Sequence, residues 1–302
     1  FFFIKDPSML NAMFKGSNNN LIKSHNLQVV LLSLLHDNEI SRVQLAQKTN
    51  LSNSTISNLI AELIEQGIVT EGATTDQEVN GLRPVGRPST GIRIVPDARF
   101  VIGVHIGVGV FRVAVVNLLG EIVHNQIEHF QMDEPALGVV EKIINAAEWV
   151  ITQSALERSR ILGVGVGASG LVDFSAGVNV LAPNLNWHNV PLRDILQSRL
   201  QLPVVVDNNV RAMAIGERFF GAGRDVESLV FVYGRIGVGA GLIFKGEVVR
   251  GSTTGAGEIG HTVMLLEGGE LCRCGNRGCL ETLVSEPAIL RQAQVLVNAQ
   301  PN

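Results

Sequence analysis

The chain has few cysteines, few aromatic residues and no long apolar run. Only 3 of its 302 residues are cysteine, an odd and small number that argues against a secreted, disulfide-stabilised domain. No stretch of about 18 uninterrupted apolar residues occurs, so the sequence predicts no transmembrane helix. Phe1-Phe2-Phe3 is too short for the apolar core of a signal peptide and lacks a basic flank. We therefore expect a cytoplasmic protein with reduced cysteines and no membrane partner.

A strong excess of charge of one sign is also missing. The net charge is -4, which gives no global signal for nucleic acid or for a membrane surface. The hydrophobic content of 46% is enough to bury a sizeable core. The 32 glycines fall mostly after residue 100, and this asymmetry indicates two architectures in one chain. The length suggests a small domain followed by a larger, bilobal one.

The cysteines cluster close to a histidine. Cys272, Cys274 and Cys279 follow His261 closely in the sequence. Three thiolates and one imidazole complete the tetrahedral shell that Zn²⁺ prefers and leave no open position. Buried thiols or a disulfide are the alternatives, but the odd count and the crowded Cys-x-Cys step disfavour a disulfide. We predict a structural zinc ion that fixes the loop carrying Glu258 and His261.

Residues 21–73 show the pattern of three helices followed by a strand. Apolar residues recur at helical spacing in the first helix, and Ser41 and Ser52 stand where N-caps of the next two helices are expected. Gly67 should end the third helix, and residues 92–95 should form a returning strand after a polar segment at 74–90. Helix, turn, helix and strand in this order are typical of a winged helix-turn-helix.

The third helix of this module begins with short polar side chains, which can reach base edges and phosphates. Residues 41–61 contain two cations and no acid. The alternative is a helical dimerisation or protein-docking module, because polar helix faces are ordinarily solvated. Arg87, which stands between Gly86 and Pro88 in the polar segment, could enter a minor groove or be an ordinary linker residue. The predicted DNA-binding residues are Arg42, Lys48, Ser52, Asn53, Ser54, Thr55, Ser57, Asn58 and Arg87.

After residue 99 the pattern changes to α/β. Buried strands are predicted at 100–107, 111–116, 161–167 and 204–206, with helices at 134–154 and 210–220. This order suggests the paired lobes of the actin and sugar-kinase type, separated by a cleft. We expect an α/β fold in three parts, namely a winged helix-turn-helix domain and linker at 1–98, a first lobe at 99–206 and a second lobe with the cysteine motif at 207–302.

Three further motifs are candidates for the walls of that cleft. The loop at 182–187 offers amide groups beside Trp187, and Asp207-Asn208-Asn209 stand between a strand and a helix, where α/β sheets bind ligands. The glycine run at 234–241 could cradle a phosphate or mark a hairpin.

Together, residues 20–290 resemble the ROK family (repressors, open reading frames and sugar kinases), and within it the winged-helix repressor branch. The resemblance is carried by motif order: the helix-turn-helix, Gly-Arg-Pro, Pro-Asn-x-x-Trp, the strand before Asn208, the glycine run, Gly-Glu-Ile-Gly-His and Cys-x-Cys-Gly-x-x-Gly-Cys-x-Glu. It implies zinc at the four residues above. It also implies that a monosaccharide is surrounded by Asn184, Asn208, Asn209, Glu258, His261 and Glu281.

The chain departs from the family's kinases at two positions. Those kinases have an acid at the start of their first phosphate segment and an aspartate as general base, whereas this chain has His105 and Asn209. Since an amide cannot accept the proton of a sugar hydroxyl, we expect no kinase activity. The chain also stops soon after Glu281, where family members continue, so we expect either a fragment or a divergent ending.

The resemblance therefore implies a sugar-responsive DNA-binding regulator, with operator DNA and a monosaccharide as partners. We expect a repressor of carbohydrate-utilisation genes that acts as a homodimer or higher homo-oligomer and is released when sugar closes the cleft. Two alternatives remain: a functional sugar kinase with an accessory DNA-binding arm, and a regulator controlled by a phosphotransferase-system protein.

Overall fold

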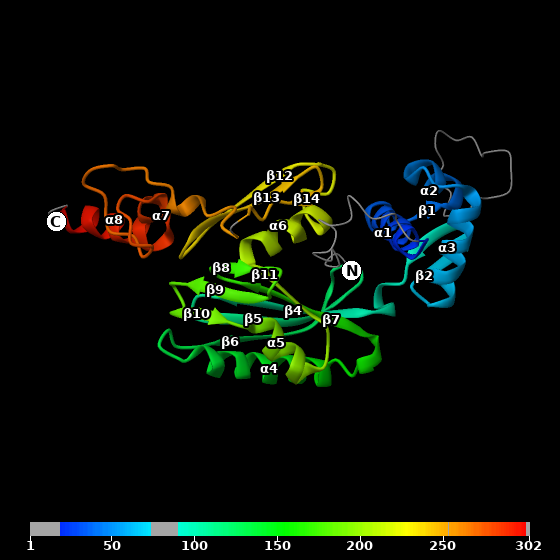
Figure 1. The fold of residues 1–302 in the computed structure, drawn as a ribbon, viewed down its shortest axis with the longest axis horizontal. Helices are drawn as coiled ribbons and strands as arrows, with labels where there is room; N and C mark the ends of the chain where they lie inside the picture. The colour runs from blue at the N-terminus through cyan, green and yellow to red at the C-terminus, as the bar shows by residue number, and fades with distance from the viewer. Residues whose placement is uncertain (1–18, 74–89, 253, 300–302) are drawn as a thin grey trace. The chain divides into compact units, whose positions relative to one another are not determined.

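The computed structural model describes residues 19–73, 90–252 and 254–299 (Figure 1). These residues form two compact units, and each is described by itself. The first comprises the described part of Phe1–Phe100 together with Asn117–Glu121, and the second comprises Val101–Val116 and the chain from Ile122 onward.

The first unit is a winged helix-turn-helix, as the sequence predicted. Its three strands form one antiparallel sheet in the order β1-β3-β2. Its elements are α1 (Asn19–Asp37), β1 (Ile40–Ser41), α2 (Arg42–Thr49), α3 (Asn53–Glu65), β2 (Val69–Ala73) and β3 (Thr90–Ile94).

Local hydrogen bonds set the boundaries of these helices. Ser41 caps α2 in a reciprocal capping box with Gln44, and Ser52 caps α3 by accepting from the Thr55 backbone N–H. Asn50 ends α2 in the left-handed conformation, and Gly67 follows α3 with φ +68°. The predicted wing tip, with Arg87, lies outside the described residues.

The second unit contains a five-stranded sheet of order β11-β7-β4-β5-β6. Strands β11 and β7 are parallel, whereas β5 and β6 form an antiparallel hairpin. In Figure 1, α4 and α5 lie on one face of this sheet and α6 on the other. The elements are β4 (Phe100–Gly107), β5 (Val110–Asn117), β6 (Ile122–His129), α4 (Ala136–Gln153), β7 (Ile161–Ala168), α5 (Leu192–Leu200), β11 (Val204–Asn208) and α6 (Asn209–Phe220).

Two smaller antiparallel sheets and a C-terminal helical segment complete this unit. The glycine run forms the hairpin between β12 and β13, which was one of its two interpretations. Helix α6 packs between the large sheet and this hairpin (Figure 1). The elements are β8 (Leu171–Asp173), β9 (Val178–Ala182), β10 (Trp187–Val190), β12 (Leu229–Gly234), β13 (Val238–Phe244), β14 (Glu247–Val248), α7 (Leu280–Val284) and α8 (Glu286–Ala299).

Buried apolar side chains of β4 and β5 belong to the core of this unit. Phe100, Ile102 and Ile106 of β4 and Phe111 of β5 are at most 2% exposed. None of the helices in the described ranges is long and apolar enough to cross a membrane.

Candidate functional site

A pocket of about 150 Å³ opens in the second unit. It lies where the turn after β4, the start of α6, the hairpin between β12 and β13, and the start of α7 come together. All six residues predicted to surround a sugar line this pocket: Asn184, Asn208, Asn209, Glu258, His261 and Glu281.

The two asparagines at the start of α6 differ in what they can offer a ligand. The Asn208 Oδ1 accepts from the backbone N–H groups of Val210 and Arg211, and its Nδ2 donates to the Gly170 carbonyl at 2.9 Å. Asn208 therefore caps α6 and joins it to the segment after β7. No hydrogen bond from another described residue reaches the Asn209 amide, so it is available to a ligand.

Glu258 and His261 come from a short segment that lies tightly against β13. Gly257 has φ +92°, and a Cβ at this position would collide with the Ala240 carbonyl oxygen, so only glycine fits. Glu258 Oε2 lies 3.9 Å from His261 Nε2. Burial raises the pKa of the Glu258 carboxyl, against the opposing attraction of His261 and Arg211.

Asn184 and Glu281 approach the hairpin turn at Gly237 from different parts of the unit. Glu281 Oε2 accepts from the Val238 backbone N–H at 3.0 Å. Asn184 Oδ1 accepts a hydrogen bond from Arg273, which stands between two of the cysteines. Sequence reasoning missed Arg273, because no local pattern connects it to a residue 89 positions away.

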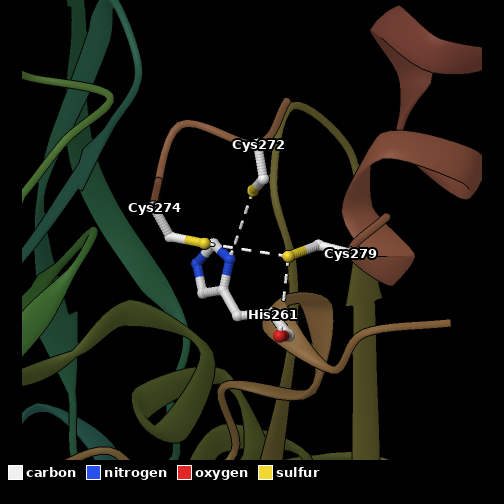
Figure 2. Close-up of side chains that lie close together, drawn as sticks. All are labelled: His261, Cys272, Cys274 and Cys279. Atoms are coloured by element: carbon white, nitrogen blue, oxygen red, sulfur yellow. Dashed lines mark hydrogen bonds between the residues drawn. The ribbon is translucent and has the colours of Figure 1, made fainter. Parts of the chain in front are cut away.

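His261 and the three cysteines gather their side chains at one point (Figure 2). Their ligand atoms all lie within 4.8 Å of one another. His261 Nδ1 is 3.6 Å from Cys272 Sγ, and Cys274 Sγ is 3.7 Å from Cys279 Sγ. These four residues can hold a metal ion.

Asp207 does not line the pocket but forms a buried ion-pair network. Its Oδ1 accepts from Arg211 Nε at 2.7 Å and its Oδ2 from Arg250 Nη2 at 2.9 Å. The side chains of Asp207 and Arg211 are each only 2% exposed. The Arg250 guanidinium also stacks over the Phe174 ring, 4.0 Å from its centre. Two guanidiniums therefore neutralise this carboxylate.

His105 lines the pocket at the end of β4. Its Nδ1 lies 3.5 Å from Arg112 Nη1, so this end of the pocket carries an imidazole beside a cation. Burial, reinforced by the charge of Arg112, lowers the pKa of His105 and keeps the ring neutral at neutral pH. Arg112, Tyr233 and Arg235 also line the pocket and were not predicted from the sequence.

The predicted DNA-binding residues of α3 form its polar N-terminal end. Asn53, Ser54 and Asn58 are exposed, and Thr55 and Ser57 are half-buried. The Ser52 hydroxyl contacts those of Ser54 and Thr55 at 2.8 and 2.9 Å. The arrangement presents hydroxyl and amide groups to a partner.

Arg42 and Lys48, the two predicted cations in the described part of the first unit, are paired with acids. Arg42 Nε donates to Glu71 at 2.6 Å, and Lys48 Nζ donates to Asp37 at 2.7 Å. Burial opposes ionisation of Asp37, but hydrogen bonds from Lys48 and His36 outweigh it and lower the pKa of the Asp37 carboxyl. A phosphate contact by Lys48 therefore has to compete with Asp37.

Comparison with known proteins identifies both units. A family model described as ROK family matches residues 101–301, and one described as winged helix-turn-helix DNA-binding matches residues 25–70. The chain is 34% identical to the xylose repressor of Caldicellulosiruptor bescii over 280 residues, which are 93% of this chain and 68% of the relative.

The solved structures that are similar to the chain include a transcriptional regulator and a kinase. A ROK family transcriptional regulator, described as a homologue of the E. coli MLC protein, aligns with a TM-score of 0.75 and 28% identity, covering 93% of this chain and 69% of that one. A ROK family glucokinase from Streptomyces griseus, solved with glucose and AMPPNP, aligns with a TM-score of 0.61 and 34% identity, covering 67% of this chain and 62% of that one.

Proposed function

The chain belongs to the ROK family, and from this premise we propose that it is a sugar-responsive transcriptional repressor that binds operator DNA and does not phosphorylate its sugar. The observation that carries the proposal is the pairing of a winged helix-turn-helix with a pocket in which Asn209 stands where the family's kinases have their general base. A cytoplasmic location and control of carbohydrate-utilisation genes are part of the proposal.

Sugar recognition is assigned to six side chains of the pocket. Glu258 and Glu281 would accept from sugar hydroxyls, while the amides of Asn184 and Asn209 can both donate and accept. Asn208 would contribute mainly by fixing the start of α6, since most of its polar capacity is already used.

Zinc is the proposed occupant of the His261 and cysteine cluster. A tetrahedron with bonds of about 2.3 Å to sulfur and about 2.0–2.1 Å to nitrogen has edges of about 3.8 Å between sulfurs and about 3.6 Å between nitrogen and sulfur. The distances of 3.7 and 3.6 Å in the cluster fit those edges. With His261 Nδ1 on the ion, its Nε2 would carry the proton and could donate to a sugar hydroxyl in the pocket.

The loss of kinase activity rests on three residues. Asn209 stands where the family's kinases have their base, and its amide accepts no proton at neutral pH. Asp207 is bound by Arg211 and Arg250. His105 replaces the acid of the first phosphate segment and lies beside Arg112, where a Mg²⁺–nucleotide would meet positive charge instead of a carboxylate.

We assign the reading of DNA sequence to the start of α3, where Asn53 and Thr55 would lie nearest the base edges. Arg42, Lys48 and Arg87 would contact phosphates or enter a groove. We propose a homodimer, because two recognition helices at a fixed spacing read two half-sites. The sugar would bind between the two proposed lobes, which are divided near residue 206. Its binding would change the spacing of the two recognition helices and release the operator DNA.

Two measurements on the full chain test the proposal. In a thermal-shift screen, a monosaccharide that prefers the native state should raise the Tm. In a coupled ADP-release assay with the same sugars, turnover should be absent or a trace, and Asn209→Asp combined with His105→Asp should partly restore it. Turnover near about 1–100 s⁻¹ would support the alternative, a working sugar kinase with a DNA-binding arm.

A further inference from the structure

We propose that Arg273 is a specificity-determining positioning residue, which orients the Asn184 amide so that its N–H groups face the pocket. The inference rests on the proposed sugar binding and deepens it, because it states the hydrogen-bond polarity that one wall of the pocket presents to a sugar.

The contact joins two distant parts of the second unit. Arg273 stands between Cys272 and Cys274, and its Nη1 donates to Asn184 Oδ1, 89 positions earlier in the chain. Asn184 belongs to the turn between β9 and β10. The hydrogen bond therefore connects the metal cluster of one proposed lobe to the sugar-contacting loop of the other.

The chemistry of the pair fixes the orientation of the amide. A guanidinium carries only donors, so it can bind only the carbonyl oxygen of an asparagine side chain. The Asn184 Nδ2 is then directed elsewhere, and it lies 3.8 Å from the position that a Cβ on Gly237 would occupy. Gly237 lines the pocket, so the Asn184 donor is presented there.

A carboxylate acceptor approaches the same turn. Glu281 Oε2 is 3.1 Å from the same Cβ position and also accepts from the Val238 backbone N–H. One donor and one acceptor therefore both approach the turn at Gly237. A sugar oxygen facing Asn184 has to accept a hydrogen bond, and without Arg273 the amide would be free to flip and offer Oδ1 instead.

The tight cysteine-containing loop holds the backbone at Arg273 in place. Cys272 is 3% exposed, and the Cys272 backbone N–H donates to the Asn276 carbonyl at 2.7 Å in a tight turn. Arg277 lies in the same cysteine-containing loop, but its Nη1 points to the Gly269 carbonyl at 3.4 Å. Arg277 is therefore a matched control, being a second arginine of the loop that does not touch the pocket.

The test measures sugar affinity by isothermal titration on the full, zinc-loaded chain. D-xylose, D-glucose and N-acetyl-D-glucosamine are the probes, followed by deoxy and deoxyfluoro analogues of whichever binds tightest. We expect Arg273→Ala to weaken that sugar roughly ten-fold, the effect of one charge-assisted hydrogen bond, while Arg277→Ala leaves the affinity unchanged.

Arg273→Glu distinguishes an orienting role from a purely structural one, because only the orienting role predicts a change in the preference for a fluorinated sugar. In the wild type, the deoxyfluoro sugar with fluorine at the position facing Asn184 should bind more tightly than the deoxy sugar with hydrogen there, because fluorine accepts a hydrogen bond but cannot donate one. A glutamate would bind Nδ2 and turn Oδ1 toward the pocket, so this preference should disappear. Arg273→Lys, which still donates, should keep it.

Three outcomes would overturn the inference. They are unchanged affinity in Arg273→Ala, equal losses in Arg273→Ala and Arg277→Ala, or an unchanged fluorine preference in Arg273→Glu, with zinc content and Tm matched to the wild type. If the wild type binds none of the three sugars, the proposed function fails first and the inference falls with it.

Discussion

At the scale of single residues, His261 belongs both to the cysteine cluster and to the lining of the pocket. Its Nδ1 lies among the cysteine sulfurs, and its Nε2 lies 3.9 Å from the Glu258 carboxylate. A metal on Nδ1 would fix both the tautomer and the ring orientation. The cysteines, although no sugar is expected to touch them, should therefore influence sugar binding.

Replacing one cysteine tests this connection. We expect Cys274→Ser to lower the zinc content, measured by elemental mass spectrometry, far below one ion per chain. Sugar affinity, measured by isothermal titration, should fall at least about ten-fold, in the range that perturbed metal sites commonly show. Arg277→Ala, in the same loop, should keep both. Full sugar affinity in the zinc-free variant would contradict the shared role of His261.

The residues also show what a sequence can reveal at this scale. Ser41 and Ser52 were predictable as caps because serine is a preferred residue at helix N-termini. In the structure each accepts a hydrogen bond from the backbone N–H three residues ahead. The cysteine cluster was predictable because its ligands are close in the chain. The Arg273–Asn184 contact and the Asp207–Arg250 pair were not, because tertiary packing brings together residues that no local pattern relates.

At the scale of elements, the junction of β11 with α6 is held by the Asp207 network. Arg211 bonds Asp207 within this junction and also donates to the carbonyls of Val172 and Thr254. Arg250 links the same carboxylate to Phe174. Since Asn208 and Asn209 lie next to Asp207, this network fixes where both asparagines stand.

Asp207→Asn should strongly destabilise the second unit. The change leaves the buried Arg211 without its counter-charge and also breaks the pair with the half-buried Arg250. Breaking a buried pair typically costs about 3–5 kcal/mol. Urea unfolding should report this as a lower free energy of unfolding. Glu148→Gln, which breaks the exposed pair with Arg158, is the control and should change that value by no more than about 1 kcal/mol. Equal, small effects would show that the network does not hold the junction.

Helices α2 and α3 should contribute differently to DNA binding, with Asn53 of α3 reading the sequence and Lys48 of α2 contacting phosphate. Substituting Asn53 with Ala should change which DNA sequence is preferred, because its side chain is exposed at the start of the helix. Lys48→Ala should weaken all sequences alike and reduce the salt-dependence slope by about one. Salt titrations of DNA binding by fluorescence anisotropy measure both effects.

The control for α3 is Lys245→Ala, since this lysine belongs to the other unit and is not assigned to DNA. It should change neither the sequence preference nor the slope. If neither Asn53→Ala nor Lys48→Ala alters binding, the first unit binds a protein instead of DNA.

The strongly patterned elements were predictable, and the short ones were not. The helices of the first unit and strands β4, β5, β7 and β11 carry caps or continuous apolar runs. Helix α5 buries only Leu192, Leu196 and Leu200 in an otherwise polar sequence, and β8 spans three residues. Such elements depend on packing against neighbours, which a single sequence does not display.

At the scale of the whole molecule, the proposal requires the pocket to influence α3. Within the second unit, contacts between its parts include Arg273 with Asn184, Arg250 with Phe174 and Asn208 with Gly170. A sugar can shift the DNA-binding equilibrium only by as much as it prefers one arrangement of these contacts. Couplings of this kind typically change affinity about 5–150-fold.

The most direct test of the central claim is DNA release by sugar. A duplex selected from a random pool by the full chain is labelled, and its dissociation constant is measured by fluorescence anisotropy with and without the sugar found by thermal shift. The account predicts at least about ten-fold weaker DNA binding with sugar, without ATP. Glu258→Gln should still bind DNA but lose the response. A sugar that binds the chain yet leaves DNA affinity unchanged, or a release that requires ATP, would contradict the account.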